Sequence, residues 1–307
     1  MTIDVHRGNS DNPRGSPHLK TFENKVAAIT GAGSGMGRSL ALELASQHCE
    51  LALSDVNESA LEETVRLASP TGVRITSKKV DVADREQVCA WASDVVRDHG
   101  RVNLIFNNAG VSLASTVEGV SYEDMEWIVG INFWGVVYGT KAFLPHLKAS
   151  GDGHIVNMSS LFGLMSAPAG SAYNATKFAV RGFTEALRQE LELANLPVSA
   201  TSVHPGGIKT NIVRWGRRDA SVRAIGLDET QPFDEIEKRF MTTADRAAQI
   251  ILRAVRNNKR RVLVGTDAVI IDKLVRMFPA GYQWIIVSLS RLRLRLSGGK
   301  QRMADSP

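Results

Sequence analysis

The chain has 307 residues, of which 37 are Lys or Arg, 32 are Asp or Glu and 2 are Cys, and 43% of it is hydrophobic. This composition excludes a wholly disordered chain and a small domain held together by disulfides. Residues 281–307 carry five basic side chains against one acidic one, so the rest of the chain is close to neutral. Nucleic acid is therefore not expected as a partner.

The sequence also indicates where the protein resides. Cys49 and Cys89 lie in apolar, helix-like stretches and are expected to be reduced residues of the core. No basic segment followed by an apolar run is found near residue 1, so we expect no secretory signal. The longest strongly apolar run near the C-terminus, Trp284–Leu289, is far shorter than the roughly 20 residues that cross a bilayer. We expect a cytoplasmic protein.

Short apolar runs and amphipathic stretches alternate along most of the chain. Residues 1–20 come before this pattern and predict a flexible leader, because they combine Asn, Ser, Pro and Gly without periodicity. The predicted strands are Val26–Thr30, Leu51–Asp55, Val73–Val80, Leu104–Asn107, His154–Met158, Val198–His204 and Arg261–Val264. The predicted helices lie near residues 37–48, 58–68, 84–98, 121–149, 171–195 and 244–257. This order predicts an α/β fold, a doubly wound parallel seven-stranded sheet with helices on both faces, in one domain over residues 21–265.

A glycine-rich turn follows the first predicted strand. Thr30, Gly31, Gly35 and Gly37 form the pattern T-G-x-x-x-G-x-G before a helix begins. Such a turn lets the backbone approach a diphosphate, and the helix N–H groups face the anion. The G-x-G-x-x-G spacing is absent, because Met36 stands where its third glycine would be. The alternative is a turn that only packs a strand against a helix.

Asp55 ends the second predicted strand, 18 residues after Gly37. A carboxylate there can accept hydrogen bonds from both adenosine ribose hydroxyls, and it repels a 2′-phosphate. Ser34 and Val56 stand where a base for NADP is expected, and Arg38 is expected to be solvated. The sequence therefore favours NAD over NADP. The structural alternative for Asp55 is a helix cap.

Tyr173 and Lys177 stand four residues apart at the start of the helix predicted near 171–195. At this spacing the two side chains share one helix face. A phenol with a pKa near 10 needs a neighbouring positive charge to act as an acid or base at neutral pH. The pattern alone is weak, because solvated helices often contain it by chance.

Three further polar features fall at the carboxyl edge of the predicted sheet or in a helix core. Ser160 follows the strand His154–Met158, where a hydroxyl can bind a substrate carbonyl, whereas we expect the neighbouring Ser159 to cap a turn. Asn132 lies in an apolar helical stretch and must find partners, so it either bends the helix or holds a water. The run Asn107–Gly110 ends the fourth strand, with a simple turn as its alternative.

Taken together, these motifs resemble the short-chain dehydrogenase/reductase family, in its single-domain branch with a Rossmann fold. The resemblance runs from about Lys25 to Val264. It rests on Thr30-Gly31-x-x-x-Gly35-x-Gly37, Asp55, Asp81-Val82, Asn107-Asn108-Ala109-Gly110, Asn132, Ser160, Tyr173-x-x-x-Lys177 and Pro205-Gly206-x-Ile208-x-Thr210.

The resemblance implies a role for each matching residue. It implies four catalytic residues: Tyr173 as general acid/base, Lys177 on the nicotinamide ribose, Ser160 on the substrate oxygen and Asn132 holding a water. It implies cofactor contacts at Gly31, Ser34, Gly35, Met36, Gly37, Asp55, Asp81, Val82, Asn108, Ala109, Gly110, Tyr173, Lys177, Pro205, Gly206, Ile208 and Thr210. No metal is expected. One departure, the second glycine at Gly207, is expected to loosen the loop that follows.

The implied activity is hydride transfer between a secondary alcohol or ketone and a nicotinamide cofactor, here NAD. Apolar residues in Leu161–Ala169, and in a stretch that resembles the family's substrate lid, favour an apolar substrate. We call Asn211–Phe240 the lid segment. Two alternatives stay open: an NADPH-dependent ketoacyl or carbonyl reductase, and an NAD-binding scaffold without turnover. Asp55 argues against the first, and the intact catalytic residues argue against the second.

Residues 266–307 form a C-terminal extension in which the resemblance ends. Ile285, Leu289, Leu292 and Leu296 recur at helical spacing beside Arg291, Arg293 and Arg295. One interpretation is a helix that packs on the lid segment or a second subunit, and the other is a peripheral membrane contact through the basic tail. Because the family commonly pairs through the helices that carry Asn132 and Tyr173, the resemblance implies a homodimer or homotetramer.

Overall fold

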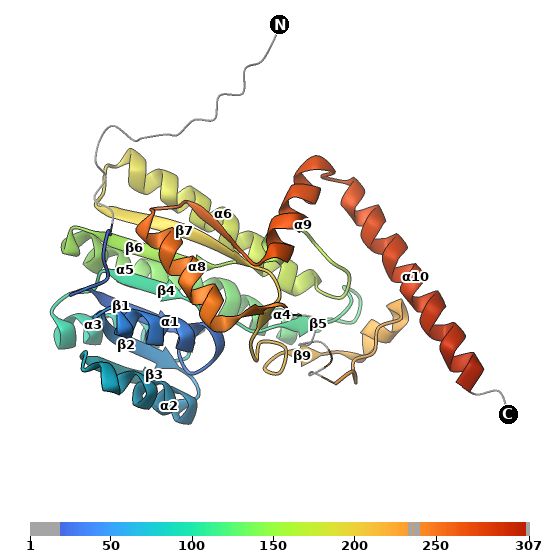
Figure 1. The fold of residues 1–307 in the computed structure, drawn as a ribbon, viewed down its shortest axis with the longest axis horizontal. Helices are drawn as coiled ribbons and strands as arrows, with labels where there is room; N and C mark the ends of the chain where they lie inside the picture. The colour runs from blue at the N-terminus through green and yellow to red at the C-terminus, as the bar shows by residue number, and fades with distance from the viewer. Residues whose placement is uncertain (1–18, 233–234, 236–239, 305–307) are drawn as a thin grey trace, which may run out of the picture.

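A seven-stranded parallel sheet forms the centre of the protein (Figure 1). The computed structural model describes residues 19–232, 235 and 240–304, except for the side chains of residues 293–304. The strands of the sheet are β1 (Val26–Thr30), β2 (Glu50–Asp55), β3 (Ile75–Lys79), β4 (Leu104–Asn107), β6 (Gly153–Met158), β7 (Val198–Pro205) and β11 (Arg261–Val264). Their order is β11-β7-β6-β4-β1-β2-β3, and every neighbouring pair is parallel. The predicted fold class is confirmed.

Helices cover both faces of the sheet (Figure 1). One face packs against α1 (Gly35–Ser46), α2 (Glu58–Ala68) and α8 (Ala244–Arg256). The other packs against α3 (Arg85–His99), α5 (Gly135–Ser150) and α6 (Ser171–Leu193). Because both faces are covered, strands such as β1 and β6 are buried along their whole length.

The structure describes several further elements. They are α4 (Tyr122–Val129), α9 (Thr266–Met277), α10 (Gly281–Ala304), the π-helix η2 (Gly130–Trp134) and the 3₁₀ turns η1 (Ser69–Thr71), η3 (Leu161–Gly163) and η4 (Ala220–Ile225). Two short parallel pairs lie outside the main sheet: β5 (Leu113–Ala114) with β9 (Arg217–Arg218), and β8 (Ile208–Lys209) with β10 (Thr242–Thr243). Both pairs tie the lid segment, or the residues next to it, to the body.

The order of the strands fixes where a ligand can bind. The chain starts in the middle of the sheet at β1, extends in one direction to β3, and then resumes on the other side of β1 with β4. In a doubly wound sheet the crevice at this switch point, beyond the carboxyl ends of the strands, is the binding site. The residues after β1, β2, β4 and β6 therefore meet at one edge.

Four sequence expectations need correction. Leu19 was placed in the leader, but it is 2% exposed and packs in the core with Phe22, whereas residues 1–18 lie outside the described residues. Cys89 is exposed on α3, and Cys49, although buried, lies in the turn before β2 and not in a helix. The predicted helix 121–149 is interrupted by the π-helix η2, and the third strand is shorter than Val73–Val80.

Candidate active site

The glycine-rich turn connects β1 to α1 and is held against the end of β4. Gly31 and Gly35 have φ angles of 63° and 51°, in the left-handed region that favours glycine. A Cβ on Gly37 would lie 2.0 Å from the Gly31 carbonyl oxygen, so only glycine allows this approach of helix and strand. The Nδ2 of Asn108 donates to the carbonyl oxygens of Thr30 (2.9 Å) and Gly31 (3.1 Å). The turn is thus a fixed cradle at the start of a helix.

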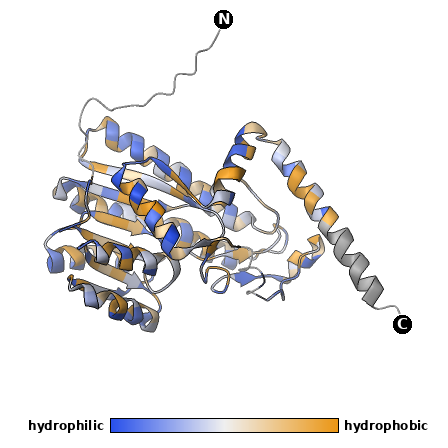
Figure 2. Ribbon diagram, viewed as in Figure 1, coloured by the Kyte–Doolittle hydropathy of each residue, from blue (hydrophilic) through white to orange (hydrophobic). Residues whose placement is uncertain are grey.

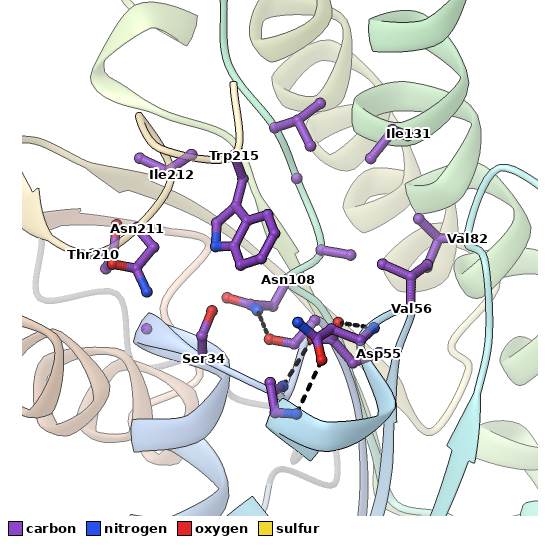
Figure 3. Close-up of a pocket in the computed structure, with 18 of the residues that line it drawn as sticks. Ser34, Asp55, Val56, Val82, Asn108, Ile131, Thr210, Asn211, Ile212 and Trp215 are labelled. Atoms are coloured by element: carbon purple, nitrogen blue, oxygen red, sulfur yellow. Dashed lines mark hydrogen bonds between the residues drawn. The ribbon is translucent and has the colours of Figure 1, made fainter. Parts of the chain in front are cut away.

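Asp55 closes this cradle on one side (Figure 3). One carboxylate oxygen accepts from the backbone N–H of Gly33 (2.8 Å) and the other from that of Asn57 (2.9 Å). The side chain that caps α2 is Asn57, which accepts from Ala60, so the helix-cap alternative for Asp55 is wrong. Because each carboxylate oxygen has a second lone pair, Asp55 can still accept hydrogen bonds from a ligand.

The expectation that Arg38 is solvated is also wrong. Its guanidinium donates to the carbonyl oxygens of Gly33 and Ala60, and its Nε donates to Thr64 Oγ1 (3.0 Å). These bonds hold Arg38 behind the glycine-rich turn, between α1 and α2, and it does not line the cavity in front of the turn. The Arg38 guanidinium therefore joins the turn to α2.

A cavity of about 510 Å³ lies in front of the turn (Figure 3). The predicted cofactor residues that line it are Gly31, Ser34, Gly35, Met36, Asp55, Asp81, Val82, Asn108, Ala109, Gly110 and Thr210. The charged residues of its lining are Asp55 and Asp81, both acidic. Ser34 is the N-cap of α1 and makes no capping bond with its side chain, so the first N–H groups of the helix are open to an anion. The cradle fits a dinucleotide, and no base in the lining would bind a 2′-phosphate.

Six predicted cofactor residues do not line this cavity. They are Gly37, which is buried below the turn, Tyr173 and Lys177 on α6, and Pro205, Gly206 and Ile208 at the end of β7 and in β8. Lys177 lies directly behind the cavity wall, because a Cβ on Gly110 would come within 3.5 Å of its Nζ.

Tyr173 and Lys177 share one face of α6, as their spacing predicts. The Lys177 Nζ lies 5.6 Å from the centre of the Tyr173 ring and donates to the carbonyl oxygen of Met158 (3.0 Å). Burial lowers the pKa of Lys177 to about 8, so the ammonium is still protonated at neutral pH. Burial raises the pKa of Tyr173, and a hydrogen bond with Ser160 opposes that shift. Tyr173 and Ser160 therefore lie close together beside a buried cation.

Ser160 is held in place by the turn that follows β6. Its Oγ accepts from the N–H of Phe162 (3.1 Å), and its carbonyl oxygen is 3.1 Å from Nδ1 of His204 at the end of β7. Because a carbonyl only accepts, Nδ1 carries the proton, and burial lowers the pKa of His204 to about 4 and keeps it neutral. The turn is capped by Ser160 and not by Ser159, which donates to the Lys177 carbonyl oxygen (2.8 Å).

Asn132 is fully buried in the π-helix η2. Its amide accepts from the N–H of Val111 (2.9 Å) and donates to the carbonyl oxygen of Val111 (2.9 Å) and to Thr176 Oγ1 (3.3 Å). The side chain thus joins η2 to the loop after β4 and to α6. Of the two roles expected from the sequence, the change of helix geometry at Asn132 is confirmed by the π-helix. The role of holding a water stays a prediction.

The loop after β7 is tied down, which corrects the expectation that Gly207 loosens it. The N–H of Gly207 donates to the Asp267 carboxylate (2.6 Å), and the N–H of Gly206 donates to the carbonyl oxygen of Val264 (2.9 Å). A Cβ on Gly206 would lie 2.3 Å from the Asp267 carboxylate. Gly206 therefore allows α9 to approach the loop closely.

The first part of the lid segment covers the cavity. Ile212 and Trp215 line it, and the Trp215 indole projects into it above Asn108 (Figure 3). Arg217 fixes this segment: it stacks on the Trp127 ring at 4.0 Å and pairs with Asp124 at 2.5 Å. Residues 233–234 and 236–239 of the lid segment lie outside the described residues.

A second wall continues from Ser160. Phe162 meets the Tyr173 ring edge to face, with ring centres 6.1 Å apart. Leu161 and Met165 are buried together with Tyr282 of the C-terminal extension, whose hydroxyl accepts from the N–H of Ser166 (3.1 Å). The surroundings of Tyr173 are thus mainly apolar.

Sequence reasoning missed several of these residues. The cavity is also lined by Gly33, Val56, Asn57, Ala60, Val80, Val111, Trp127, Ile131 and Asn211. Trp127 and Ile131 are four residues apart on consecutive helical elements, a spacing that could have placed them on one face. No pattern in the sequence pointed to Asp267, His204 or Tyr282, because their partners are distant along the chain.

The chain is similar to proteins of one family. The profile of the short chain dehydrogenase family matches residues 25–220. The SadH protein of Mycobacterium tuberculosis, whose name describes it as an oxidoreductase, is 50% identical over 272 residues, 88% of this chain and 96% of that protein.

Two solved structures show the same architecture. A short chain dehydrogenase/reductase from Burkholderia phymatum in complex with NAD is 32% identical, with a TM-score of 0.75, over 84% of this chain and 95% of that chain. An alcohol dehydrogenase from the archaeon Thermococcus sibiricus, complexed with 5-hydroxy-NADP, is 26% identical, with a TM-score of 0.64, over 78% of this chain and 95% of that chain.

The family profile covers more than half of the chain, and the relative from Mycobacterium is matched along nearly its whole length. The parallel sheet and its helices agree with these solved structures. The chain is therefore a member of the short-chain dehydrogenase/reductase family, an oxidoreductase that acts on CH–OH groups.

Proposed function

We propose that the protein interconverts a secondary alcohol and a ketone with NAD, on an apolar substrate, and that Tyr173 is the general acid/base. The observation that carries this proposal is the cluster of Tyr173, Ser160 and Lys177, in which the buried Lys177 Nζ lies 5.6 Å from the centre of the Tyr173 ring and directly behind the cavity wall. The bound nicotinamide would supply or accept the hydride. The protein supplies position and proton transfer.

Each catalytic side chain has a distinct task in this proposal. In the direction of oxidation, Tyr173 accepts the hydroxyl proton of the substrate while Ser160 donates a hydrogen bond to the same oxygen. The Lys177 ammonium stabilises the phenolate of Tyr173 and binds the nicotinamide ribose. Asn132 would hold a water that carries the proton to solvent. The reverse direction uses the same groups, with Tyr173 as the acid.

The preference for NAD is supported by the charges of the cavity. Asp55 and Asp81 are the charged residues of its lining, and the nearby base, Arg38, is bonded to backbone carbonyls behind the turn. A 2′-phosphate would meet a carboxylate with no cation among the lining residues to balance it. An NADPH-dependent reductase is therefore the less favoured alternative.

An apolar substrate is supported by the residues around Tyr173. Phe162 lies against its ring, Leu161 and Met165 continue that wall, and Trp215 and Ile212 cover the cavity. Hydrophobic and aromatic linings with few polar groups are typical of sites for apolar small molecules. A panel in which polar sugars outperform apolar alcohols would contradict this part.

We further propose that the protein is a cytoplasmic homodimer or homotetramer, paired through α5 and α6. Trp134, next to α5, and Phe178, on α6, are large apolar side chains exposed to solvent. Exposed aromatic residues of this kind are enriched at interfaces. Sedimentation equilibrium of the full chain tests this: a monomer at micromolar concentration would contradict it.

The test of the function is a fluorescence titration with NADH and NADPH, followed by turnover on secondary alcohols. The expected result is tighter binding of NADH and oxidation of apolar alcohols, which is lost in Tyr173→Phe although NADH still binds. Tighter binding of NADPH would overturn the cofactor assignment. Full biological effect with Tyr173→Phe, in cells that depend on the protein, would instead indicate a scaffold without turnover.

A further inference from the structure

The C-terminal arm, which we define as α9 and α10, begins in a buried contact and then leaves the domain. Tyr282 at the start of α10 is buried against Leu161 and Met165, and its hydroxyl accepts from the N–H of Ser166. Ile286, one turn later, packs on the same cluster. Beyond this contact, α10 extends away from the sheet and its covering helices (Figure 1). The arm is thus anchored at one end only.

Apolar residues recur along the described part of this arm (Figure 2), and several of their large side chains are exposed. The exposed fractions are 67% for Met277, 53% for Phe278, 74% for Trp284, 53% for Leu289 and 52% for Leu292. A single exposed apolar residue is ordinary, but a series of them along one arm indicates an interaction site.

The arm also carries an excess of positive charge. Residues 266–304 contain seven Lys or Arg and two acidic residues, Asp267 and Asp272, which leaves 30 basic and 30 acidic residues in the rest of the chain. Arg276 pairs with Asp272, so the excess lies along α10. Exposed aromatic and aliphatic residues combined with an excess of bases are typical of helices that lie in the interface of an anionic membrane.

We propose that the C-terminal arm docks the enzyme on the surface of an anionic lipid bilayer. A bilayer offers both the apolar layer for Trp284 and Leu289 and the negative headgroups for α10. A second copy of the chain offers no net counter-charge, because the rest of the chain has as many basic as acidic residues. No helix within the described part of the chain is long and apolar enough to cross a membrane, so the arm would lie on the surface.

The anchored end of the arm connects this surface to the catalytic site. Tyr282 is packed on Leu161 and Met165, which belong to the wall that starts at Ser160. Docking would therefore bring the apolar side of the site close to the lipid surface. The idea that docking brings the site to its substrate rests on the apolar substrate proposed above, whereas the docking itself does not.

The test is sedimentation of the full chain with lipid vesicles. One set of vesicles contains about 30 mol% phosphatidylserine in phosphatidylcholine and the other contains phosphatidylcholine alone. The variant is Trp284→Gln with Leu289→Gln. The matched control is Val117→Gln with Leu193→Gln, two exposed apolar residues of the body. Turnover of a water-soluble alcohol checks that the catalytic domain is intact in all proteins.

We expect the parent and the control to bind the anionic vesicles, and the arm variant to bind them at least about 10-fold more weakly. Raising the salt from about 0.1 M to about 0.5 M should weaken the binding of the parent, because it screens the headgroups. Equal binding of the arm variant and the control would overturn the proposal, as would no binding to either vesicle. A smaller molecular mass of the arm variant in sedimentation equilibrium, without vesicle binding by the parent, would assign the patch to a second copy. Failure of the proposed chemistry would not alter these readouts.

Discussion

The two sides of the site are built in different ways. The anion-binding part of the cofactor side is made by residues that are close in sequence: the turn from Thr30 to Gly37 and Asp55, which accepts from Gly33 inside that turn. Asp81, Asn108 and Thr210 complete the cavity from further along the chain. The side proposed to hold the substrate is assembled from the turn after Ser160, the lid segment and the C-terminal arm, which are far apart in sequence. Cofactor chemistry is thus encoded in local patterns, whereas specificity depends on long-range contacts that can change without altering the chemistry.

The largest effect is expected from Tyr173→Phe, at the boundary between the two sides. Removal of the phenolic hydroxyl should lower kcat by about 10²–10⁴-fold, because general acid/base catalysis contributes that much. Binding of NADH should stay within about threefold of the parent, because Tyr173 does not line the cavity. Tyr122→Phe, at an exposed tyrosine, is the control. Retained turnover in Tyr173→Phe would move the acid/base role to another group.

Gly37→Ala tests the cofactor side. A Cβ there would lie 2.0 Å from the Gly31 carbonyl oxygen, so helix α1 or the turn must shift. We expect NADH affinity to fall by about 100-fold and thermal stability to fall as well. The control is Gly182→Ala on α6, where a Cβ meets no atom within 4 Å, and where alanine should be neutral or stabilising by up to about 1 kcal/mol. Titration calorimetry and thermal melts measure both effects.

The pH dependence of stability tests how Ser160 is supported. Burial lowers the pKa of His204 from 6.5 to about 4, so between these values the unfolded chain binds a proton that the folded protein does not. Above pH 6.5 the protonation of His204 does not reduce the stability of the fold. As the pH falls toward 4, proton uptake by the unfolded chain lowers the free energy of unfolding by about 3 kcal/mol.

The variant for this prediction is His204→Asn, which keeps an N–H donor near the carbonyl oxygen of Ser160. Urea melts from pH 7 to about pH 4 should show a shallower loss of stability in the variant than in the parent. If the free energies of unfolding of parent and variant differed by the same amount at every pH, the substitution would only change packing. The titration of His204 would then not be the cause of the pH dependence.

The same contrast explains how much the sequence predicted. The glycine-rich turn and the face shared by Tyr173 and Lys177 follow from spacing alone, and the parallel sheet follows from the alternation of strands and helices. Arg38 was misjudged because its acceptors, Gly33 and Ala60, meet only when α1 packs on α2. Asp267 and Tyr282 were missed because their partners lie 60 and 116 residues away. Periodicity and motifs contain local information, and these contacts are tertiary.

A smaller effect is expected when the charge of the cofactor side is changed. Asp55→Ser removes the carboxylate that accepts from Gly33 and Asn57 and that would accept from the ribose. NADH affinity should fall by about 10–30-fold while that for NADPH rises, because a charged hydrogen bond is lost and a repulsion is relieved. Asp81→Asn, in the same cavity, should weaken both nucleotides alike. A parallel loss for both in Asp55→Ser would remove Asp55 as the selector.

The smallest effect is expected on the substrate side, from Arg217→Met. The variant loses the stacking of the guanidinium on Trp127 and the ion pair with Asp124, but it keeps the backbone pairing of β5 with β9. A cation–π contact contributes about 0.5–2 kcal/mol, so KM for the alcohol should rise about 3–10-fold as the lid segment loosens over the cavity. NADH affinity should change less than KM, because the turn and Asp55 are untouched. Arg97→Met, which also removes exposed ion pairs but lies on α3, is the control. If NADH affinity fell as much as KM rose, the two sides would be one coupled unit, and the division between a local cofactor side and a long-range substrate side would be wrong.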